Sequence, residues 1–403
     1  MRHPTSGKPL LWLVAIGVFM QMLDSTIVNT ALPSMAASLG ESPLRMQSVV
    51  VAYSLTMATL IPASGWLADR FGTRRVYLAS IVLFTLGSLL CALSRDLDQL
   101  VAARVVQGIG GAMLLPVGRL AVLRSVSRGE FLAAMSFVTI PGLFGPLIGP
   151  TLGGWLVQVA SWHWIFLINL PVGLLAGLAS LRLMPALRSA VARFDFGGYL
   201  MLSFSMVAIS LSLDGLSGLG LRHAGVLLLL FAGMAGFAAY WLHAARTPQP
   251  LFPLRLFGVH SYRVGVLGNL FARIGSASMP FLIPLLLQLG LGYSPMNAGM
   301  MMIPVVLAGM ASKRLVVPLV GRLGYRRVLI GNTVLVGLAM ASFALMEPGH
   351  PTWLRVLQLA FFGLVNSLQF TAMNTVTLSE LDGELASSGN SLLSMVMMLA
   401  SSL

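Results

Sequence analysis

DRFGTRRVYL at residues 69–78 returns as GRLGYRRVLI at residues 321–330, with five of the ten positions identical. Both copies are short basic turns that contain a glycine and lie between two long apolar runs. A repeat over this distance indicates two copies of one helical bundle, each with the same charged turn on the same side of a membrane. Two related bundles that face each other across a bilayer are expected of a secondary transporter.

The composition excludes an ordinary soluble domain. Of the 403 residues, 57% are hydrophobic and 9% are charged, and the mean hydropathy is +0.88. Soluble domains carry about 25% charged residues, so lipid must solvate most of this surface. The net charge of +13 comes from short loops without interleaved aromatic residues, which argues against a nucleic-acid partner. The single cysteine, Cys91, excludes an intrachain disulfide and a cysteine-rich metal site.

Twelve apolar runs and the start of a thirteenth approach the roughly 20 residues that a helix needs to cross the hydrocarbon. We expect these runs near residues 10–33, 46–67, 76–94, 99–122, 131–158, 164–184, 197–213, 223–243, 263–288, 295–319, 328–346 and 354–377, and from residue 385 onward. The last run reaches Leu403, so we expect the natural chain to continue. The basic leader Met1–Pro9 lacks a small-residue cleavage pattern behind it, and we interpret the first run as an uncleaved anchor.

The basic residues indicate the orientation of these runs. With the N-terminus in the cytoplasm, eighteen Lys and Arg residues fall in cytoplasmic loops, and four fall outside, namely Arg45, Arg95, Arg222 and Arg355. This is a strong positive-inside bias. Three acidic residues between 380 and 384 also lie inside, but acidic side chains weigh little in that rule.

The runs predict an all-α membrane protein made of three parts. Residues 1–189 hold six runs and form an N-terminal six-helix bundle. Residues 190–262 hold an inserted helix pair and a linker that contains Pro248, Pro250 and Pro253. Residues 263–403 begin a second six-helix bundle, which is incomplete at Leu403.

Several motifs resemble those of the major facilitator superfamily. GWLADRFGTRR at 65–75 resembles its loop signature, RVVQGIGG at 104–111 its fourth-helix motif, and GLFGPLIGPTLGG at 142–154 the fifth-helix motif associated with antiporters. LDSTIVNTALP at 23–33 looks like the first-helix signature of the fourteen-span drug:proton antiporters. WHWIFLINLPVG at 162–173 and the stretch from Gln288 to Pro304 also look like that branch.

The resemblance covers essentially the whole chain and implies a multi-pass transporter of the bacterial inner membrane. It implies multidrug efflux by exchange with protons, with no cofactor besides the proton gradient. The expected partners are a small-molecule substrate and the lipid bilayer, and the expected state is a monomer. The chain departs from the pattern at Gly321, which stands where the first turn has Asp69, and at Arg119, an extra basic residue near the end of the fourth run.

Asp24 is the only acidic residue inside a predicted run, and it lies roughly 21 Å beyond Leu10 at about 1.5 Å per residue. Arg104 comes from the other side and lies about 10 Å below that surface, so the two side chains sit at similar depth. Charges there are costly unless they are paired or face water. If the site opens to water on one side and then the other, it would load and release a proton, with Asp24 and Arg104 in the coupling path. The alternative is a static ion pair that only fixes helix packing.

The first basic turn has a mechanical interpretation. Asp69 can accept hydrogen bonds from a helix N-terminus or from an arginine across the loop, which would hold neighbouring helices in one state. We expect glycines to permit close approach and a tight turn. The predicted gating loop consists of Gly65, Asp69, Arg70, Gly72, Arg74 and Arg75. The alternative is that these basic residues only set the topology.

The fifth run carries a stripe of small residues. Gly142, Gly145, Gly149 and Gly153 lie on one helical face, and Gly154 follows. Small residues permit close helix contact, and Pro146 and Pro150 bend the helix. The contact is the same whether it only packs the helices or slides and seals during transport.

The identity of the cargo is the property that the sequence indicates least. Polar residues on one stripe of run twelve indicate either a cavity or interhelical hydrogen bonds. We expect the substrate cavity to be lined by Asn29, Gln107, Arg273, Gln288, Asn366 and Asn374. The family resemblance favours amphipathic drugs. Arg273 lies near mid-membrane with no acidic partner in its half, however, so an anionic metabolite or its metal chelate is an alternative cargo. The other interpretation is that Arg273 donates to backbone carbonyls or pairs with a residue beyond 403.

Two other classes of function lack the residues that they need. The six histidines are scattered without metal-ligand spacing, and no phosphate-binding loop occurs, which excludes an ATP-driven pump or a membrane enzyme. A receptor or scaffold that transports nothing is a remote alternative. The antiporter-type fifth-helix motif and the paired basic turns argue against that class.

Overall fold

The computed structural model describes residues 8–126, 128–188, 194–217, 223–378, 380–381 and 383–402. These residues form helices and their connections, and no strand occurs among them. Apolar segments become helices in a membrane because each backbone N–H must find its acceptor within the same segment. Ten described stretches are long and apolar enough to cross a membrane, and Phe196–Ser212 is a shorter apolar stretch.

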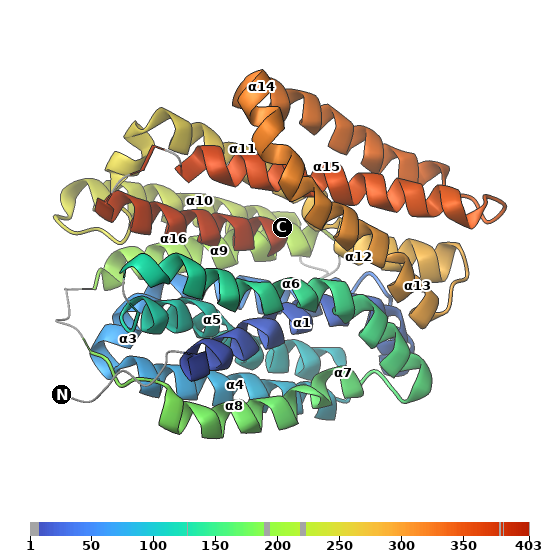
Figure 1. The fold of residues 1–403 in the computed structure, drawn as a ribbon, viewed down its shortest axis with the longest axis horizontal. Coiled ribbons are helices and arrows are strands. Elements are labelled where there is room, and N and C mark those ends of the chain that lie inside the picture. The colour runs from blue at the N-terminus through green and yellow to red at the C-terminus, as the bar shows by residue number, and fades with distance from the viewer. Residues whose placement is uncertain are drawn as a thin grey trace.

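The first six predicted runs are confirmed as helices. They form α1 (Lys8–Leu39), α2 (Gln47–Leu60) continued by η1 (Ile61–Ala63) and α3 (Ser64–Phe71), α4 (Thr73–Leu93), α5 (Leu97–Leu123), α6 (Arg128–Val159), and α7 (Trp164–Leu167) continued by α8 (Asn169–Leu183). Helix α1 packs along α6, and α4 packs along α5. In Figure 1 these helices occupy the lower half of the molecule.

The remaining runs are also confirmed as helices. They form α9 (Phe196–Ser217), α10 (His223–Arg246), η2 (Leu254–Gly258), α11 (His260–Ala277), α12 (Met279–Leu285), the π-helical turn η3 (Leu286–Gly290), α13 (Pro295–Met301), α14 (Ile303–Ser342), η4 (Phe343–Leu345), α15 (Thr352–Leu378) and α16 (Gly383–Ser402). Helices α9 and α10 pack on each other, and α9 also contacts α2 and α16. Figure 1 shows α9, α10 and α16 between the lower helices and α11 and α15, while α12 and α13 lie at the right beside the lower helices.

The two basic turns share one backbone conformation. Gly72 has φ 91° and ψ 142°, and Gly324, which interrupts α14, has φ 77° and ψ 155°. A side chain disfavours this region, and glycine adopts it readily. The repeat seen in the sequence is therefore also a repeat of structure. We call the end of the bundles that carries these turns the basic-turn end, and the other, which carries residues 40–46 and 291–294, the opposite end.

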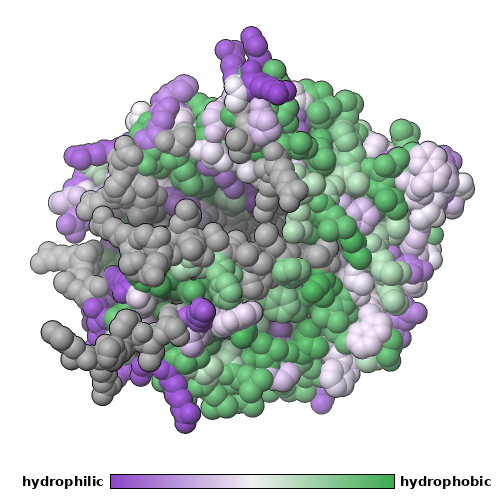
Figure 2. Space-filling model, viewed as in Figure 1, coloured by the Kyte–Doolittle hydropathy of each residue, from purple (hydrophilic) through white to green (hydrophobic). Residues whose placement is uncertain are grey.

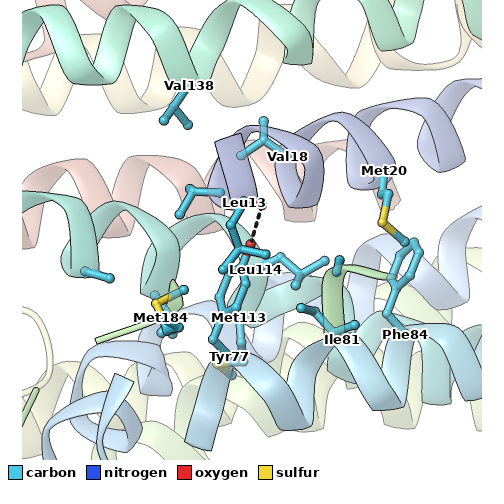
Figure 3. Packing of buried hydrophobic residues seen from close by; sticks show 14 of the residues in the cluster. Leu13, Val18, Met20, Tyr77, Ile81, Phe84, Met113, Leu114, Val138 and Met184 are labelled. Carbon is cyan, nitrogen blue, oxygen red and sulfur yellow. Dashed lines mark hydrogen bonds between the residues drawn. The ribbon is translucent and has the colours of Figure 1, made fainter. Parts of the chain in front are cut away.

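Apolar side chains fill the first bundle. Tyr77 of α4 is fully buried among α1 and α5, and its hydroxyl donates to the carbonyl of Leu13 at 3.3 Å. Figure 3 shows this bond among Leu114, Met184 and other core side chains. Gly17 of α1 faces the Tyr77 hydroxyl so closely that a Cβ would overlap it. The position of α1 is thus fixed by close packing as well as by burial.

Much of the outer surface is apolar, as expected for a protein solvated by lipid. Large side chains such as Phe231, Leu228 and Phe271 are each at least two-thirds exposed. Figure 2 shows hydrophobic residues right of the centre and over the lower part of this face, and hydrophilic residues mainly at its margins. The exposed aliphatic side chains therefore face the bilayer.

The inserted helices are tied down at the basic-turn end through Asp195. One carboxylate oxygen accepts from His243 at 2.7 Å and from the N–H of Gly198 at 2.8 Å, and the other accepts from the N–H of Leu251 at 3.1 Å. Burial acts to raise the pKa of Asp195, but these hydrogen bonds outweigh it and the pKa is lowered. The ionised carboxylate joins the start of α9 to the end of α10 and to the linker behind it.

Candidate functional site

A buried ion pair joins the first and fourth spans. Asp24 on α1 accepts from Arg104 on α5, with 2.6 Å between Oδ2 and Nη1. Asp24 is 0% exposed and Arg104 is 1% exposed. Removing two charges from water is costly, and a close pair repays the cost only when its remaining polar atoms are also bonded.

A cage of polar side chains supplies those remaining bonds. Gln107 of α5 donates to Asp24 Oδ1 at 2.7 Å and accepts from Arg104 at 2.6 Å. Asn169 of α8 donates to the same Asp24 oxygen at 3.2 Å, and both amides donate to Ser88 of α4. Arg104 Nε donates to the carbonyl of Val49 on α2 at 3.2 Å. Five helices of the first bundle therefore meet at one carboxylate and its partner.

Aromatic rings cover the guanidinium. The Arg104 Cζ atom lies 4.1 Å from the ring centroid of Tyr53 on α2 and 5.9 Å from that of Phe166 on α7. A cation over an aromatic face is stabilised by the ring quadrupole, most strongly where water is excluded. The rings also separate the charges from their surroundings.

A cavity of about 310 Å³ lies between the two bundles, next to the ion pair. Its walls come from α1 and α2 on one side and from α11, α12 and α15 on the other. The lining residues are Gln21, Met22, Ser25, Asn29, Val50, Tyr53, Ser54, Met57, Arg273, Ser276, Pro280, Phe281, Asn366 and Phe370. Apolar walls with a few polar groups are typical of small-molecule sites.

Arg273 is the one charged residue among these lining residues. Its Cζ atom lies 4.2 Å from the centroid of the Phe370 ring. Its Nε atom is buried and has no hydrogen-bond partner among the residues that the structure describes. The second bundle thus presents a cation to the cavity without an acidic neighbour on its wall.

The glycine stripe brings α6 against α1. A Cβ at Gly145 would lie 2.7 Å from the backbone nitrogen of Leu23, and one at Gly153 would lie 2.7 Å from the carbonyl of Ile27. At Gly149 a Cβ would overlap the hydroxyl of Thr26. These contacts flank Asp24 along α1, so α6 cannot carry a larger side chain on this face without moving the helix that holds the carboxylate.

The same helix joins the two bundles. A Cβ at Gly154 would overlap the carbonyl of Pro295 on α13, and one at Gly299 would overlap that of Pro150. Thr151 donates to the Gly299 carbonyl at 3.4 Å. Figure 1 shows α13 against the end of α6, while α14 rises away from α6 toward its break. The contacts lie near the opposite end. Gly142 and Pro146 belong to α6, but their surroundings lie outside what the structure describes.

The first basic turn contacts two other segments. Asp69 pairs with Arg124, with 2.7 Å between Oδ1 and Nη2, so its partner is the C-cap of α5 rather than an arginine across the turn. Arg74 donates to the carbonyl of Met184 at 2.6 Å, behind α8. Arg70 lies over Trp66, with 5.3 Å from Cζ to the ring centroid, and Arg75 is exposed.

The two glycines of this turn differ. A Cβ at Gly72 would meet Arg188 side-chain atoms at 3.3 Å, and the φ of +91° disfavours any side chain. The expectation that Gly65 permits close approach is wrong, because nothing lies within 4 Å of a Cβ there. In the second turn, nothing lies within 4 Å of a Cβ at Gly321 or Gly324. The second turn therefore has the same backbone conformation as the first, but its glycines do not make close contacts with other segments.

Comparison with known proteins decides the family. Residues 14–403 match the model described as Major Facilitator Superfamily. The chain belongs to this superfamily. It is 55% identical to a protein of Serratia proteamaculans named multidrug resistance protein MdtD, over 100% of this chain and 84% of that one. It is also 55% identical to the protein of the same name from Pectobacterium carotovorum, over 100% of this chain and 86% of that one.

Solved structures support the superfamily fold. A D-xylose-proton symporter gives a TM-score of 0.67 at 16% identity, covering 98% of this chain and 88% of that one. A peptide transporter POT gives a TM-score of 0.71 at 16% identity, covering 97% and 86%. At this identity the likeness concerns the fold alone, which is that of a multi-span helical transporter.

Only some of the residues that we expected to line the substrate cavity do so in the structure. Asn29, Arg273 and Asn366 line it. Gln107 is instead part of the Asp24 cage, and Gln288 donates to the carbonyl of Thr30 at 3.0 Å, which ties η3 to α1. Asn374 lies two turns beyond Asn366 on α15, and it is not among the lining residues. Gln107 thus makes its hydrogen bonds within the first bundle, and Gln288 makes its hydrogen bond between the two bundles.

The polar residues that form one stripe on α15 also have different roles. Ser367 donates to the carbonyl of Gly309 on α14 at 2.8 Å, and Thr377 accepts from Asn269 on α11 at 3.2 Å. These two residues follow the alternative of interhelical hydrogen bonding. Among the described residues, no group of three or more His, Cys, Asp or Glu side chains is placed to hold a metal ion.

Several site residues were not anticipated from the sequence. Asn169 occurs in the superfamily-branch motif at 162–173, which was its only signal. Ser88 and Tyr53 belong to none of the motifs, and Arg124 was counted only as a basic loop residue. Their roles depend on which helices are neighbours, and spacing along the chain does not reveal that.

The turn glycines give a direct stability test. We expect Gly72→Ala to lower the free energy of unfolding by roughly 1–2 kcal/mol, because alanine at positive φ is strained and also approaches Arg188. The measurement is thermal unfolding of the purified protein in detergent.

Gly65→Ala is the matched control. It adds the same methyl group seven residues earlier, within α3 and in open space, so we expect stability to stay the same or to rise by up to about 1 kcal/mol. Equal destabilisation by both substitutions would contradict the account of the turn.

Proposed function

We propose that this chain is a proton-coupled exporter of small amphipathic molecules, including drugs, that works by alternating access. The observation that carries the proposal is the buried Asp24–Arg104 pair beside a cavity that both bundles line. The relatives named as multidrug resistance proteins support drug efflux. The proposal includes no catalytic step, no metal and no resident cofactor, because the proton gradient supplies the driving force.

Asp24 and Arg104 form the proton site in this proposal. A proton delivered by water binds an Asp24 oxygen, neutralises the carboxylate and removes the charge that holds Arg104. The guanidinium is then left in a buried place without its counter-ion, which is costly. Rearrangement of the surrounding helices relieves that cost, and loss of the proton restores the pair.

The contacts near the opposite end are the part that alternates. Three contacts hold the bundles together between the cavity and that end, namely Gly154 with Pro295, Gly299 with Pro150, and Gln288 with Thr30. Close contacts between small residues can part and re-form without leaving large side chains unpacked. Asp69 and Arg124 form the corresponding latch at the basic-turn end, within the first bundle.

The orientation and the setting are also proposals. The excess of Lys and Arg in loops at the basic-turn end supports a cytoplasmic location for that end and for the N-terminus. The opposite end then faces the periplasm, across the inner membrane. We propose that the protein functions as a monomer, since each chain supplies both walls of the cavity.

The proton site is tested by Asp24→Asn in the full-length protein. We expect the variant to insert and fold but to lose energised efflux of a fluorescent cationic dye, because the asparagine amide cannot take up or release a proton as a carboxylate does. The measurement is dye uptake into everted vesicles, which corresponds to export from the cell, with and without an imposed pH gradient.

Asp195→Asn is the matched control for that experiment. It also removes a carboxylate bonded to a basic side chain, but it lies beside α9 and away from the cavity. We expect efflux by this variant to stay close to that of the wild type. Normal gradient-driven efflux by Asp24→Asn would show that the Asp24 pair is structural.

A second candidate function is export of an anionic metabolite or its metal chelate. Arg273 favours it, because its Nε atom is buried without a partner among the described residues and no described lining residue is acidic. A carboxylate supplies both the missing charge and a bidentate acceptor. A strongly cationic drug would be repelled unless it bound on the Asp24 side.

Arg273→Ala distinguishes the two cargo classes. If the cargo is a carboxylate, its KM should rise about tenfold to a hundredfold, since a hydrogen bond to a charged group contributes about 1.5–3 kcal/mol. The measurement compares efflux of small carboxylates and cationic dyes in cells stripped of other pumps.

Arg119→Ala is the control, since Arg119 is an exposed arginine of α5 that does not line the cavity. Robust dye efflux that is unchanged in Arg273→Ala, with no carboxylate export by the wild type, would remove the anion hypothesis.

A further inference from the structure

Tyr53 lies between the cavity and the ion pair. Its side chain lines the cavity, and the face of its ring lies 4.1 Å from the Arg104 Cζ atom. Asp24 does not line the cavity and is fully buried, although its α1 neighbours Gln21 and Ser25 do. On this side, the tyrosine ring therefore stands where water from the cavity would reach the charges.

The Tyr53 ring is blocked on the α5 side and borders open space on the cavity side. On the α5 side, a Cβ at Gly108 would lie 3.0 Å from the Tyr53 carbonyl, and a Cβ at Gly111 would lie 2.8 Å from the Tyr53 hydroxyl. Two glycines thus let α5 press against the backbone and the tip of this residue. The cavity lies on the other side. A rotation of the side chain away from Arg104 would carry it into that space.

The Tyr53 hydroxyl is buried and has no hydrogen-bond partner among the described residues. The same holds for Oε1 of Gln21, which lines the cavity as well. Buried polar atoms without partners are rare in native proteins and call for an explanation. In the position that the structure shows, the Tyr53 hydroxyl packs against Gly111 of α5. After rotation of the ring into the cavity, this hydroxyl would be satisfied by a polar group of a molecule bound there, beside the Gln21 amide.

We propose that Tyr53 is the gate between the cargo cavity and the proton site. Cargo that accepts a hydrogen bond from the Tyr53 hydroxyl after the ring has rotated into the cavity holds the ring off Arg104. Water then reaches Asp24, where a proton binds or leaves. The gate makes proton exchange depend on cargo. It rests on the proposed function of Asp24, and it makes Tyr53 a positioning residue rather than the proton carrier.

The test is proton leakage in the absence of cargo. Purified full-length protein is placed in liposomes with a pH gradient, and proton flux is followed with an internal pH-sensitive dye. We expect Tyr53→Leu to leak protons many-fold faster than the wild type without cargo, because leucine leaves the path to Asp24 uncovered. Tyr53→Phe keeps the ring and should stay tight, with a several-fold higher KM for cargo.

Phe281→Leu is the matched control, because it shortens an aromatic residue on the α12 wall of the same cavity. We expect no leak from it. A leak of equal size from both leucine variants would overturn the gate and show that cavity size alone matters. Folding is checked by gel filtration and thermal unfolding, and Tyr53→Met repeats the test with fuller packing if the leucine variant unfolds.

The double variant separates the gate from the proton site. If the gate covers Asp24, then Tyr53→Leu combined with Asp24→Asn should stop the leak. A folded Tyr53→Leu that stays tight and pumps with normal coupling would overturn the gate, whatever Asp24→Asn does alone. A leak that persists in the double variant would show that the uncovered path does not pass through Asp24, and would overturn the gate as stated.

Discussion

The rest of the structure depends on the pairing of Asp24 with Arg104. A carboxylate without exposure to water has two ways to avoid the cost of burial, namely to keep a counter-ion or to take up a proton. Here the carboxylate has its counter-ion at 2.6 Å and also accepts from the amides of Gln107 and Asn169. Those partners come from several helices, so a change of protonation is also a change in how the first bundle is held together. In the proposed function, this dependence is what couples proton binding to helix movement.

The packing around α1 allows that coupling to reach the second bundle. Glycines of α6 contact α1 on both sides of Asp24, and Gly154 of the same helix contacts α13 across the bundle interface. The helix that supports the carboxylate is therefore the helix that fastens the two bundles near the opposite end. The cavity lies between these contacts and the pair, with α1 and α2 as one wall and α11, α12 and α15 as the other. A shift of α1 relative to α6 would move the wall and the fastening together.

Much of the fold could be predicted from the sequence, because membrane helices are set by local composition. All thirteen apolar runs correspond to helices, and the repeated glycine predicted a turn that the structure shows at positive φ in both copies. The similar depth of Asp24 and Arg104 also followed from counting residues along helices. Contacts between helices could not be obtained in this way. Arg124 as the partner of Asp69 and Asn169 as a member of the cage depend on neighbours 55 and 145 residues away. Gln288, which belongs to a motif that resembles the family branch, was likewise expected in the cavity, although it ties η3 to α1.

The most direct test of the central claim is proton release on cargo binding. Purified protein in weakly buffered detergent solution is mixed with a transported dye at a series of pH values, and the change in bulk pH is recorded. The account predicts that the wild type releases protons over a limited pH range and that Asp24→Asn, which binds the dye, releases none. Equal release from both proteins, or none from a wild type that pumps the dye in liposomes, would contradict it.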